Sequence, residues 1–485
     1  MSEYFRVITF CFFVFLLFTG LDCASTRPPL EDIIIEEDDV LNETERCDNL
    51  MKRPIPNSLI VKVDTFIGPD IVDPEQPEIT PPFIDSIKLE LKERFFYNFP
   101  QVSLDTLKIK KVCGCGYLLF DGLPAIIKPE YTKKGGKGKQ EDDYIQAIGS
   151  NFEIDPPVFP PPPPLLEVNP PPTDSFKIDP YPTYGEEGPP IRVAIIDSGV
   201  DYFHKDLINA IWPGDEMDKR NGCLKLDSIG YDFVRGDSDS ATIENFLPYD
   251  NLGHGTHING IIANSFSSNL DLNLINLKIF DRLGTDLFTA ACAIDYADTM
   301  EVDVINLSWG FYAKEPPLIL ETVLDKVQKS GILVVSSVGN DSINVDCCPH
   351  WPSNFTFIHN NHIAVAAKDS LIDTLAAYSN YVYRGGRADL SALGTFISTY
   401  PDRNRAVSDS LISASGTSMA AALVTRSVAF LKAQTPEKTF LNLKEEIEGG
   451  AKSLSDSLVI HKHTKKDTWH DLDTLDIPPL KKYQQ

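Results

Sequence analysis

The sequence predicts an α/β fold, a parallel β-sheet with helices on both faces, preceded by a small α+β module. Continuous apolar runs indicate strands that are buried on both faces, as the strands of parallel sheets are. Helical patterns lie between several of these runs, and this alternation is typical of βαβ units. The runs are IRVAIID at 191–197, LNLINLKIF at 272–280, DVINLSWG at 303–310, GILVVSSVG at 331–339 and HIAVAA at 362–367; the helical patterns include LFTAACAIDYA at 287–297 and LILETVLDKVQKS at 318–330.

Composition and charge narrow the classes of function. The chain of 485 residues is too long for one typical domain, and its 42% hydrophobic and 24% charged residues are ordinary for a globular protein. The formal net charge is -26 and no stretch resembles a basic stripe. Because nucleic acids are held mainly through phosphate contacts, we exclude nucleic acid as a partner.

Residues 1–24 are interpreted as a cleaved signal peptide. The apolar run from Val7 to Phe18 follows Arg6 and is shorter than the roughly 20 residues that span a bilayer. An uncleaved signal anchor is the alternative. We therefore expect a protein of the secretory pathway, secreted or kept in a secretory organelle. Residues 25–57 follow as an acidic, solvated spacer.

Two folded units are predicted after the spacer, with an exposed segment between them. Residues 58–150 form the α+β domain, since SLIVKV, TLKIKKV and GYLLFDG have strand character and FIDSIKLELKERFF has an amphipathic helical pattern. Residues 151–190 form a linker that a protease could reach, because 14 of the 36 prolines lie between Pro156 and Pro190 and favour polyproline II. A larger domain over 191–440 and a tail over 441–485 complete the chain.

Nine cysteines occur in the chain, and their pairing stays open. Cys113 lies one residue from Cys115, and Cys347 is adjacent to Cys348. Neither pair has the CxxC spacing that is typical of zinc sites. Asn42 in NET and Asn354 in NFT match the pattern of glycosylation acceptors, so we expect a glycoprotein.

Three polar clusters stand in glycine-containing segments. Asp197 ends the first strand in IIDSGVD, His254 lies in DNLGHGTHINGII, and Ser418 follows Gly416 and Thr417 in SASGTSMAAALV. Each cluster alone has an ordinary explanation: a turn cap, a helix start and a helix cap. Together they supply what a serine nucleophile needs, which is a base to take its proton and a third group to orient that base.

AIIDSGVD, HGTHINGIIA and SGTSMAAA, in this order, resemble the three signatures of the subtilisin-like serine proteases, the subtilase family. The resemblance covers roughly Arg192 to Gln434 and implies a subtilisin-like fold. It implies that Asp197 orients His254, which deprotonates Ser418, and that the serine then attacks a peptide carbonyl to form an acyl enzyme. Polypeptides are the implied substrates, and no cofactor is required for the chemistry.

Two further segments resemble parts of the family's site. Asn340 in GILVVSSVGN resembles the oxyanion-hole asparagine and would act with the backbone N–H of Ser418; an asparagine in a left-handed turn is the alternative. Ser308, Trp309 and Gly310 in VINLSWG resemble the substrate-binding strand, whose backbone would pair with an extended peptide. The alternative is an ordinary strand end with Trp309 packed in the core.

The chain also departs from the family pattern. Ala422 stands where most members have proline, and the usual histidine two residues later is absent. Neither position touches the proton transfers. IWPGDEMDKRNG at 211–222 and GYDFVRGDSDS at 230–240 resemble a calcium-binding insertion, but basic residues such as Lys219 and Arg220 interrupt the aspartates. Structural calcium is therefore one interpretation and a solvated acidic loop the other, and the metal ligands stay unknown.

The resemblance also predicts how the protein is made. Many members carry a propeptide that assists folding and occupies the cleft until it is cleaved, and residues 58–150 have a suitable size. We expect a monomeric, secreted serine endopeptidase made as a zymogen, with its own propeptide as intramolecular inhibitor and the cut between Lys128 and Pro190. The alternative from another class is a non-catalytic binding protein on a subtilisin-like fold, which would use the cleft or the linker as a docking surface.

Overall fold

The computed structural model places the elements of the chain and leaves several segments undescribed. The predicted signal peptide, most of the proline-rich linker and most of the acidic insertion lie outside the described residues. The described residues are 37–63, 81–96, 98, 103–113, 115–124, 144–159, 190–214, 229–234, 247–264, 272–369, 375–381, 389–402, 408–450, 452–453 and 470–471.

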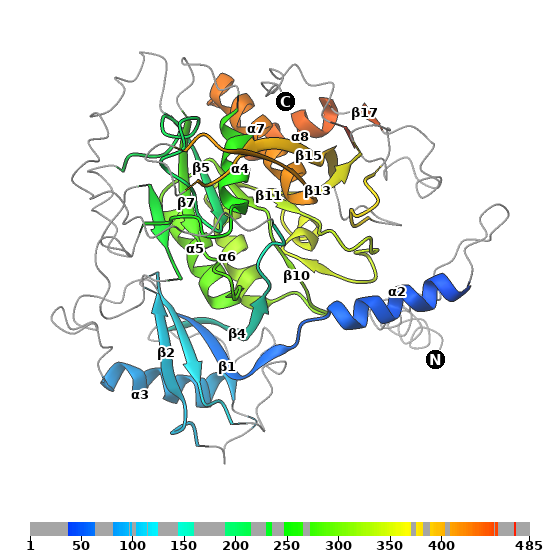
Figure 1. Cartoon of the computed structure of the whole chain (residues 1–485). Coiled ribbons are helices and arrows are strands. Elements are labelled where there is room, and N and C mark those ends of the chain that lie inside the picture. The colour runs from blue at the N-terminus through cyan, green and yellow to red at the C-terminus, as the bar shows by residue number, and fades with distance from the viewer. Residues whose placement is uncertain are drawn as a thin grey trace, which may run out of the picture.

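The main sheet is the centre of the molecule and is almost entirely parallel (Figure 1). Among the described residues it has nine strands in the order β17-β18-β14-β13-β11-β9-β5-β7-β6, and only β17 and β18 pair antiparallel. The bounds are β5 Ile191–Asp197, β6 Gly230–Asp232, β7 Leu272–Lys278, β9 Val304–Leu307, β11 Leu333–Ser337, β13 His362–Lys368, β14 Leu390–Leu393, β17 Lys452–Ser453 and β18 His470–Asp471.

Helices cover both faces of the main sheet, and alternate residues of each strand supply the two cores. In β5, Val193 and Ile195 pack with the helices of one face, whereas Ala194 and Ile196 pack with those of the other. Such continuous apolar strands are expected where both faces are buried. The first face carries α4 His254–Ala263, α7 Thr417–Gln434 and α8 Phe440–Gly450, and the second carries α5 Leu287–Thr299 and α6 Leu318–Lys329.

Short elements complete the main domain, by which we mean the described residues from 190 onward. Two small antiparallel sheets pair β10 with β12 and β15 with β16. Their bounds, with the remaining short helix, are β10 Phe311–Tyr312, β12 His350–Trp351, η6 Ser353–Phe357, β15 Thr395–Thr399 and β16 Leu411–Ser415.

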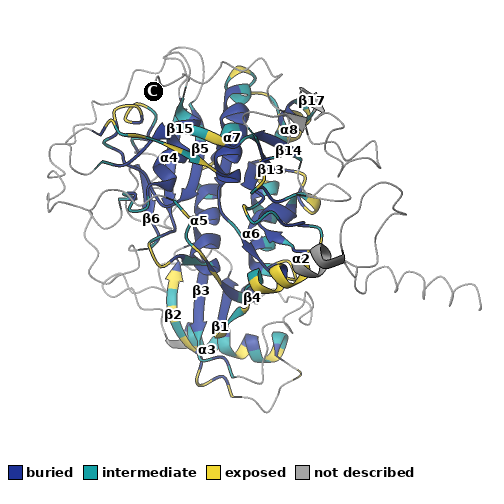
Figure 2. Ribbon diagram, turned by 45° about the vertical axis from the view of Figure 1, so that its right-hand side comes forward, coloured by how far each residue is buried: buried dark blue, intermediate teal, exposed yellow. Residues whose placement is uncertain are grey.

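A second, antiparallel sheet with one helix forms the N-terminal module, defined here as β1 to β4 with α3 and η1. One face of the sheet packs on α3 through residues such as Leu59 and Val61, and the other packs on the α5 and α6 face of the main domain through Ile60 and Leu119. The module therefore lies against these two helices (Figures 1 and 2). Its elements are β1 Pro54–Val63, α3 Pro81–Glu90, η1 Leu91–Phe95, β2 Lys108–Cys113, β3 Tyr117–Asp121 and β4 Ile145–Ile154.

The main domain adds one strand to the sheet of the module. β8, Thr285–Asp286, pairs antiparallel with the end of β4, so that Glu153 lies opposite Asp286 and Ile154 opposite Thr285. The sheet order is thus β2-β3-β1-β4-β8. Residues 155–159 leave this edge in the direction of the main sheet's α4 side, where Phe159 packs.

Three of the predicted segment boundaries need correction. The expected spacer 25–57 contains helix α2, Glu37–Leu50, and the first residues of β1. It is not a solvated spacer throughout, since Cys47 of this helix is buried and disulfide-bonded to the main domain. The expected linker start at 151 falls inside β4, whose pairing with β1 and β8 continues to Ile154. The expected tail from 441 begins within α8, whose Leu443 and Ile447 are buried in the core of the α4 and α7 face.

The predicted fold class is confirmed, since every strand and helix expected in the main domain has its counterpart within a few residues. The four elements expected in the module are present as well, but β4 was not predicted. In the part of the chain that the structure describes, no helix has the length and apolar character needed to cross a membrane.

Candidate active site

Asp197 and His254 meet at the carboxyl end of the main sheet. Asp197 is the last residue of β5 and His254 the first residue of α4, and both side chains are buried. His254 Nδ1 lies 2.8 Å from Asp197 Oδ1 and 3.0 Å from Oδ2, and Oδ1 also accepts the backbone N–H of Ser198 at 2.7 Å. The carboxylate therefore fixes the orientation of the imidazole and leaves Nε2 as the ring nitrogen that can exchange a proton with another group.

Two glycines let helix α4 start close to the end of β5. Gly253 has φ 93°, in the left-handed region that favours glycine, and a Cβ there would lie 2.6 Å from the Tyr400 ring. A Cβ at Gly255 would lie 2.2 Å from the carbonyl oxygen of Gly199. The glycine after His254 in the HGTH pattern is therefore explained by the close approach of two backbone segments, independently of any catalytic role of the histidines.

Ser418 is the second residue of α7, which begins directly after Gly416. The side chain is 7% exposed, and its Oγ donates to the carbonyl oxygen of Ser308 at 3.0 Å. Within the described residues no hydrogen bond joins Ser418 Oγ to His254. Its position in the first turn of α7 places the hydroxyl at the positive end of the helix dipole, which favours developing negative charge.

Asn340 lies at the same carboxyl edge of the sheet, three residues after the end of β11. Its Oδ1 accepts the backbone N–H of Thr417 at 2.8 Å and the Thr417 hydroxyl at 3.0 Å. Asn340 is exposed. Because Oδ1 is held by the residue before Ser418, the Nδ2 amide is the donor end that an incoming oxygen can meet.

The segment Ser308 to Gly310 follows β9 and runs past the start of α7. Besides the bond from Ser418 Oγ, Ser308 Oγ donates to the carbonyl oxygen of Ser418 at 3.0 Å, so the two residues exchange two hydrogen bonds. Trp309 is 4% exposed and packs in the core near Phe280, as the ordinary alternative for this side chain anticipated. Gly310 lies against His350, since a Cβ on it would be 2.2 Å from the ring.

One aromatic contact at this site has no signal in the sequence. The ring of Phe159, five residues after the end of β4, lies 5.4 Å from the His254 ring in an edge-to-face arrangement. It makes a similar contact with His257, at 5.4 Å, and lies 6.2 Å from Tyr400. Phe159 stands among prolines in the sequence, where local pattern gives no reason to expect a contact with a histidine far along the chain.

The second histidine of HGTH has a different environment from the first. His257 is buried, its Nε2 lies 3.2 Å from the carbonyl oxygen of Ile412, and burial lowers its pKa to about 3. It is therefore neutral at physiological pH. Its contacts are structural, whereas the His254 ring is paired with a carboxylate.

The structure corrects one expected glycosylation acceptor. Asn354 is 2% exposed, and its Nδ2 donates to the carbonyl oxygen of Val345 at 3.2 Å, so the side chain is not accessible to a glycan in the folded protein. The Asn42 side chain lies outside the described residues. The same holds for residues 215–228 and 235–246, the acidic part of the expected calcium insertion; elsewhere, in the described residues, no group of three or more potential metal ligands gathers.

An aspartate–histidine pair and a serine in the first turn of a helix, at the carboxyl edge of a parallel sheet, are the groups that serine hydrolases use. Comparison with known proteins narrows the class. Residues 188–465, more than half of the chain, match the family model described as Subtilase family. The chain belongs to the subtilase family and is a subtilisin-like serine protease.

Several characterised relatives are similar to the same region. Thermitase of Thermoactinomyces vulgaris is 29% identical over 278 residues, covering 56% of this chain and 84% of the relative. Subtilisin DY of Bacillus licheniformis is 28% identical over 291 residues, covering 58% of this chain and 91% of the relative. Among solved structures, a cold-adapted subtilisin-like serine proteinase is 21% identical with a TM-score of 0.43, covering 59% of this chain and 89% of that one.

Proposed function

We propose that this protease is a secreted endopeptidase made as a zymogen, in which Asp197, His254 and Ser418 carry the chemistry. The observation that supports it most directly is the pair of distances, 2.8 and 3.0 Å, between His254 Nδ1 and the Asp197 carboxylate. With Nδ1 held as the N–H donor, Nε2 accepts the proton of Ser418 and later returns it to the leaving amine. Asp197 stabilises the imidazolium that forms in between.

Ser418 must change its hydrogen bond before it can react. In this structure its hydroxyl donates to the Ser308 carbonyl oxygen, and rotation about the side-chain bond would direct the same proton toward His254. Hydrogen bonds of this kind often tighten only when substrate is bound. The backbone of Ser308 to Gly310 would then pair with the peptide, which frees the serine from its present partner.

The oxyanion of the tetrahedral intermediate would be held by two donors. One is the backbone N–H of Ser418 in the first turn of α7, and the other is Nδ2 of Asn340, whose Oδ1 is already fixed by Thr417. Fixed donors stabilise the developing charge without reorganising at the moment of reaction. No metal or cofactor takes part in these steps, and structural calcium in 211–222 and 230–240 stays a prediction.

We infer that the N-terminal module is the propeptide and inhibits the enzyme in the same chain. Two contacts, and the short segment that connects them, support this. β4 of the module pairs with β8 of the main domain, residues 155–159 lead on from that pairing, and the Phe159 ring lies against the ring of His254. An aromatic ring at this place would hinder both the approach of a substrate and the movement of the imidazole.

Entry into the secretory pathway through residues 1–24 is part of the proposal. Disulfides form and persist in oxidising compartments, and the bonds Cys47–Cys348 and Cys113–Cys292 fit such a location. The protein is proposed to act as a monomer on polypeptide substrates.

A serine-directed fluorophosphonate probe tests the proposal. We expect the processed protein to be labelled, and the Ser418→Ala variant to lose all labelling because the nucleophile is gone. Ser427→Ala is the matched control, since Ser427 is a buried serine of the same helix whose hydroxyl only donates to Leu423 O. Labelling that persists in Ser418→Ala, or no labelling of any processed form, would favour the non-catalytic binding protein instead.

N-terminal sequencing of active protein tests the zymogen. We expect the mature chain to begin between Lys128 and Pro190. A mature chain that begins before Tyr117 would retain most of the module within the active enzyme and would contradict the proposal.

A further inference from the structure

A buried carboxylate that belongs to none of the three signatures lies beside the Asp197 and His254 pair. Asp250 is fully buried and stands four residues before the start of α4. Its Oδ1 accepts the backbone N–H groups of Leu252 at 2.9 Å and Gly253 at 2.8 Å. Its Oδ2 accepts both the N–H and the hydroxyl of Thr256, at 2.8 and 2.7 Å. One side chain thus holds the turn before α4 and the first turn of the helix.

The same carboxylate reaches the end of β5. Ser198, the residue after Asp197, donates its hydroxyl to Asp250 Oδ1 at 2.9 Å, and this hydroxyl in turn accepts the N–H of Gly255 at 2.8 Å. Asp197 and Ser198 close the strand, and His254 and Gly255 open the helix. Asp250 therefore joins the two backbone segments that present the reactive pair, at a helix N-terminus where an anion is favoured.

We propose that Asp250 is a positioning residue for the proton transfer, which keeps the imidazole of His254 in hydrogen-bond reach of Asp197. A carboxylate offers about four lone-pair sites, and five hydrogen bonds use them fully here. An asparagine of the same shape would turn NH₂ donors toward groups that are themselves donors. The start of α4 would then shift relative to β5, and a misplacement of 1 Å in such a site can cost about 10²-fold in rate.

The test separates positioning from folding. In Asp250→Asn we expect kcat and the rate of fluorophosphonate labelling to fall by about 10²-fold per folded molecule, with KM little changed because Asp250 does not contact the Ser308 to Gly310 segment. Ser198→Ala keeps the charge of Asp250 and removes only the hydroxyl that links Asp250 to the N–H of Gly255. We therefore expect a smaller fall in kcat in this variant. Asp232→Asn is the matched control, a buried carboxylate at the end of β6 that accepts the N–H of Val234, and it should keep kcat.

The proposal is overturned if folded Asp250→Asn keeps the kcat of the wild type, or if Asp232→Asn loses as much. Should Asp250→Asn fail to fold, Ser198→Ala decides: an unchanged kcat in that variant overturns the bridge. Wild-type labelling is measured first, so that failure of the proposed function is recognised separately.

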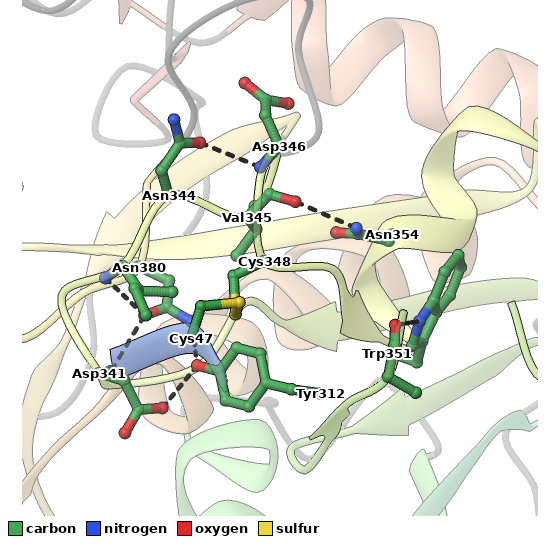
Figure 3. The surroundings of a disulfide bond; sticks show 12 residues. Cys47, Tyr312, Asp341, Asn344, Val345, Asp346, Cys348, Trp351, Asn354 and Asn380 are labelled. Carbon is green, nitrogen blue, oxygen red and sulfur yellow. Dashed lines mark hydrogen bonds between the residues drawn. A yellow bond between two sulfur atoms is a disulfide. The ribbon is translucent and has the colours of Figure 1, made fainter. Parts of the chain in front are cut away.

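A second, independent observation concerns the way the N-terminal module is attached. Cys113 at the end of β2 is bonded to Cys292 in α5, and Cys47 in α2 is bonded to Cys348 in the loop before β12 (Figure 3). Each bond joins a cysteine before the proline-rich segment to one after it, across 179 and 301 residues. All four cysteines are at most 8% exposed.

Cleavage of the linker would therefore leave the module on the enzyme. Both bonds bypass the expected cut, and a buried ion pair between Lys62 of β1 and Asp295 of α5, at 2.6 Å, adds to the contact. A tethered inhibitor also keeps a high effective concentration at its site, in the millimolar range for short tethers. Cut protein would therefore stay inhibited.

We propose that release of the module requires a dithiol reductant in addition to the proteolytic cut; this rests on the proposed role of the module. A reductant thiolate attacks one sulfur of Cys113–Cys292 or Cys47–Cys348, forms a mixed disulfide and expels the other cysteine as a thiolate, which takes up a proton. The second reductant thiol then displaces the bound cysteine. Each bond thus takes two electrons and two protons, and the reductant leaves as a disulfide.

Electrophoresis and activity test this in four samples, cut and uncut protein with and without dithiothreitol. We expect cut protein to run as one species without reductant and as two with it, and peptidase activity to rise by about 10²-fold only when cut and reductant are combined. Uncut protein is the matched control, since its intact chain still holds the module after reduction.

Two fragments without reductant, or full activity while the fragments remain bonded, would overturn the tether. The Cys47→Ser, Cys113→Ser double variant gives a second measure: if its cut form still runs as one species without reductant, these two bonds are not required to hold the module. Electrophoresis reads the tether even if no activity is found, so the two proposals fail distinguishably.

Discussion

Two histidines of α4, about one helical turn apart, have different hydrogen-bond partners and therefore different proposed roles. His254 and His257 both point from the first turn of α4, yet His254 is bonded to the Asp197 carboxylate and His257 to a carbonyl oxygen of the chain. Burial lowers the pKa of His257 to about 3, so it cannot supply a proton near neutral pH. The residue type permits general-base chemistry, and the partner decides which histidine can perform it.

Asn340 is the residue whose proposed role is simplest to measure. In Asn340→Ala the oxyanion would lose one of its two donors, and such losses in serine proteases typically reduce kcat by about 10² to 10³-fold. KM should change little, because the donor acts mainly in the transition state. Steady-state kinetics on a peptide substrate measures both constants. Asn360→Ala, at an exposed asparagine that precedes β13 and so lies at the amino edge of the sheet, is the control. A kcat of Asn340→Ala equal to that of the control would remove Asn340 from the mechanism.

At the scale of elements, α4 is held by its fit against β15 as much as by its own sequence. A Cβ on Gly260 would lie 2.2 Å from Thr399 Oγ1 and 2.3 Å from Ser398 Oγ. These hydroxyls donate to carbonyl oxygens of the helix, Thr399 to Thr256 and Ser398 to His257. The helix can therefore approach the strand only where a glycine faces it.

Gly260→Ala tests this fit. The added methyl group has no room, so α4 must move away from β15 and carry His254 with it. We expect the free energy of unfolding to fall by about 1 to 3 kcal/mol, the usual cost of overpacking, and kcat to fall as well. Chemical denaturation and steady-state kinetics measure the two effects.

Ala263→Gly provides the comparison for that helix. It weakens α4 by up to about 1 kcal/mol through the loss of helix propensity and adds no atoms, so kcat should be kept. If Gly260→Ala lost stability but kept full kcat, the position of α4 would not depend on its contact with β15.

At the scale of the whole molecule, the module and the main domain share one core. Residues of β1, β3 and β4 pack in the same cluster as those of α5 and α6, and the buried contact between Lys62 and Asp295 lies within this interface. Asp295 also pairs with Lys326 of α6, and Lys326 lies 2.9 Å from Asp298. Release of the module would separate Lys62 from Asp295 and leave Asp295 with Lys326, so this ion pair adds to the cost of release.

Buried histidines should make the stability of the whole protein depend on pH. Burial lowers the pKa of His257 and of His350 to about 3, and lowers that of His362 well below its ordinary value. Below about pH 6.5 the unfolded chain binds protons that the folded protein does not, so the free energy of unfolding falls as pH falls. Each histidine contributes about 1.4 kcal/mol per pH unit well below that value, and nothing above about pH 7.5.

Thermal denaturation of Ser418→Ala, which prevents self-digestion, between pH 7.5 and 5 measures this slope. Replacing His350 with Gln in that background should reduce the slope by about one third. Burial raises the pKa values of Asp201 and Asp303, so these two groups make the free energy of unfolding rise as pH falls toward their ordinary acidic pKa. The slope just below pH 6.5 therefore reports the histidines. A midpoint that stays constant from pH 7.5 to 5 would contradict the prediction.

The sequence by itself determined the strands of the main sheet and the residues of the proposed triad. Apolar runs such as 191–197 and 331–339 are long enough to be buried on both faces, and a strand of that kind reports its surroundings in its own composition. Asp197, His254 and Ser418 stood out because glycines and small residues flank them. Both signals are local, and a single sequence contains them in full.

Only the tertiary structure decided the contacts that join distant segments. The pairing of β4 with β8, the Phe159 ring on His254, the hydrogen bond from Ser198 to Asp250 and the disulfides Cys113–Cys292 and Cys47–Cys348 depend on parts of the chain up to 301 residues apart. None of these contacts is marked by a periodicity or a residue spacing in the sequence, because the role of a buried carboxylate or cysteine depends on the partner that packing brings to it. The sequence therefore identified the reactive groups, and packing decided what positions them and what covers them.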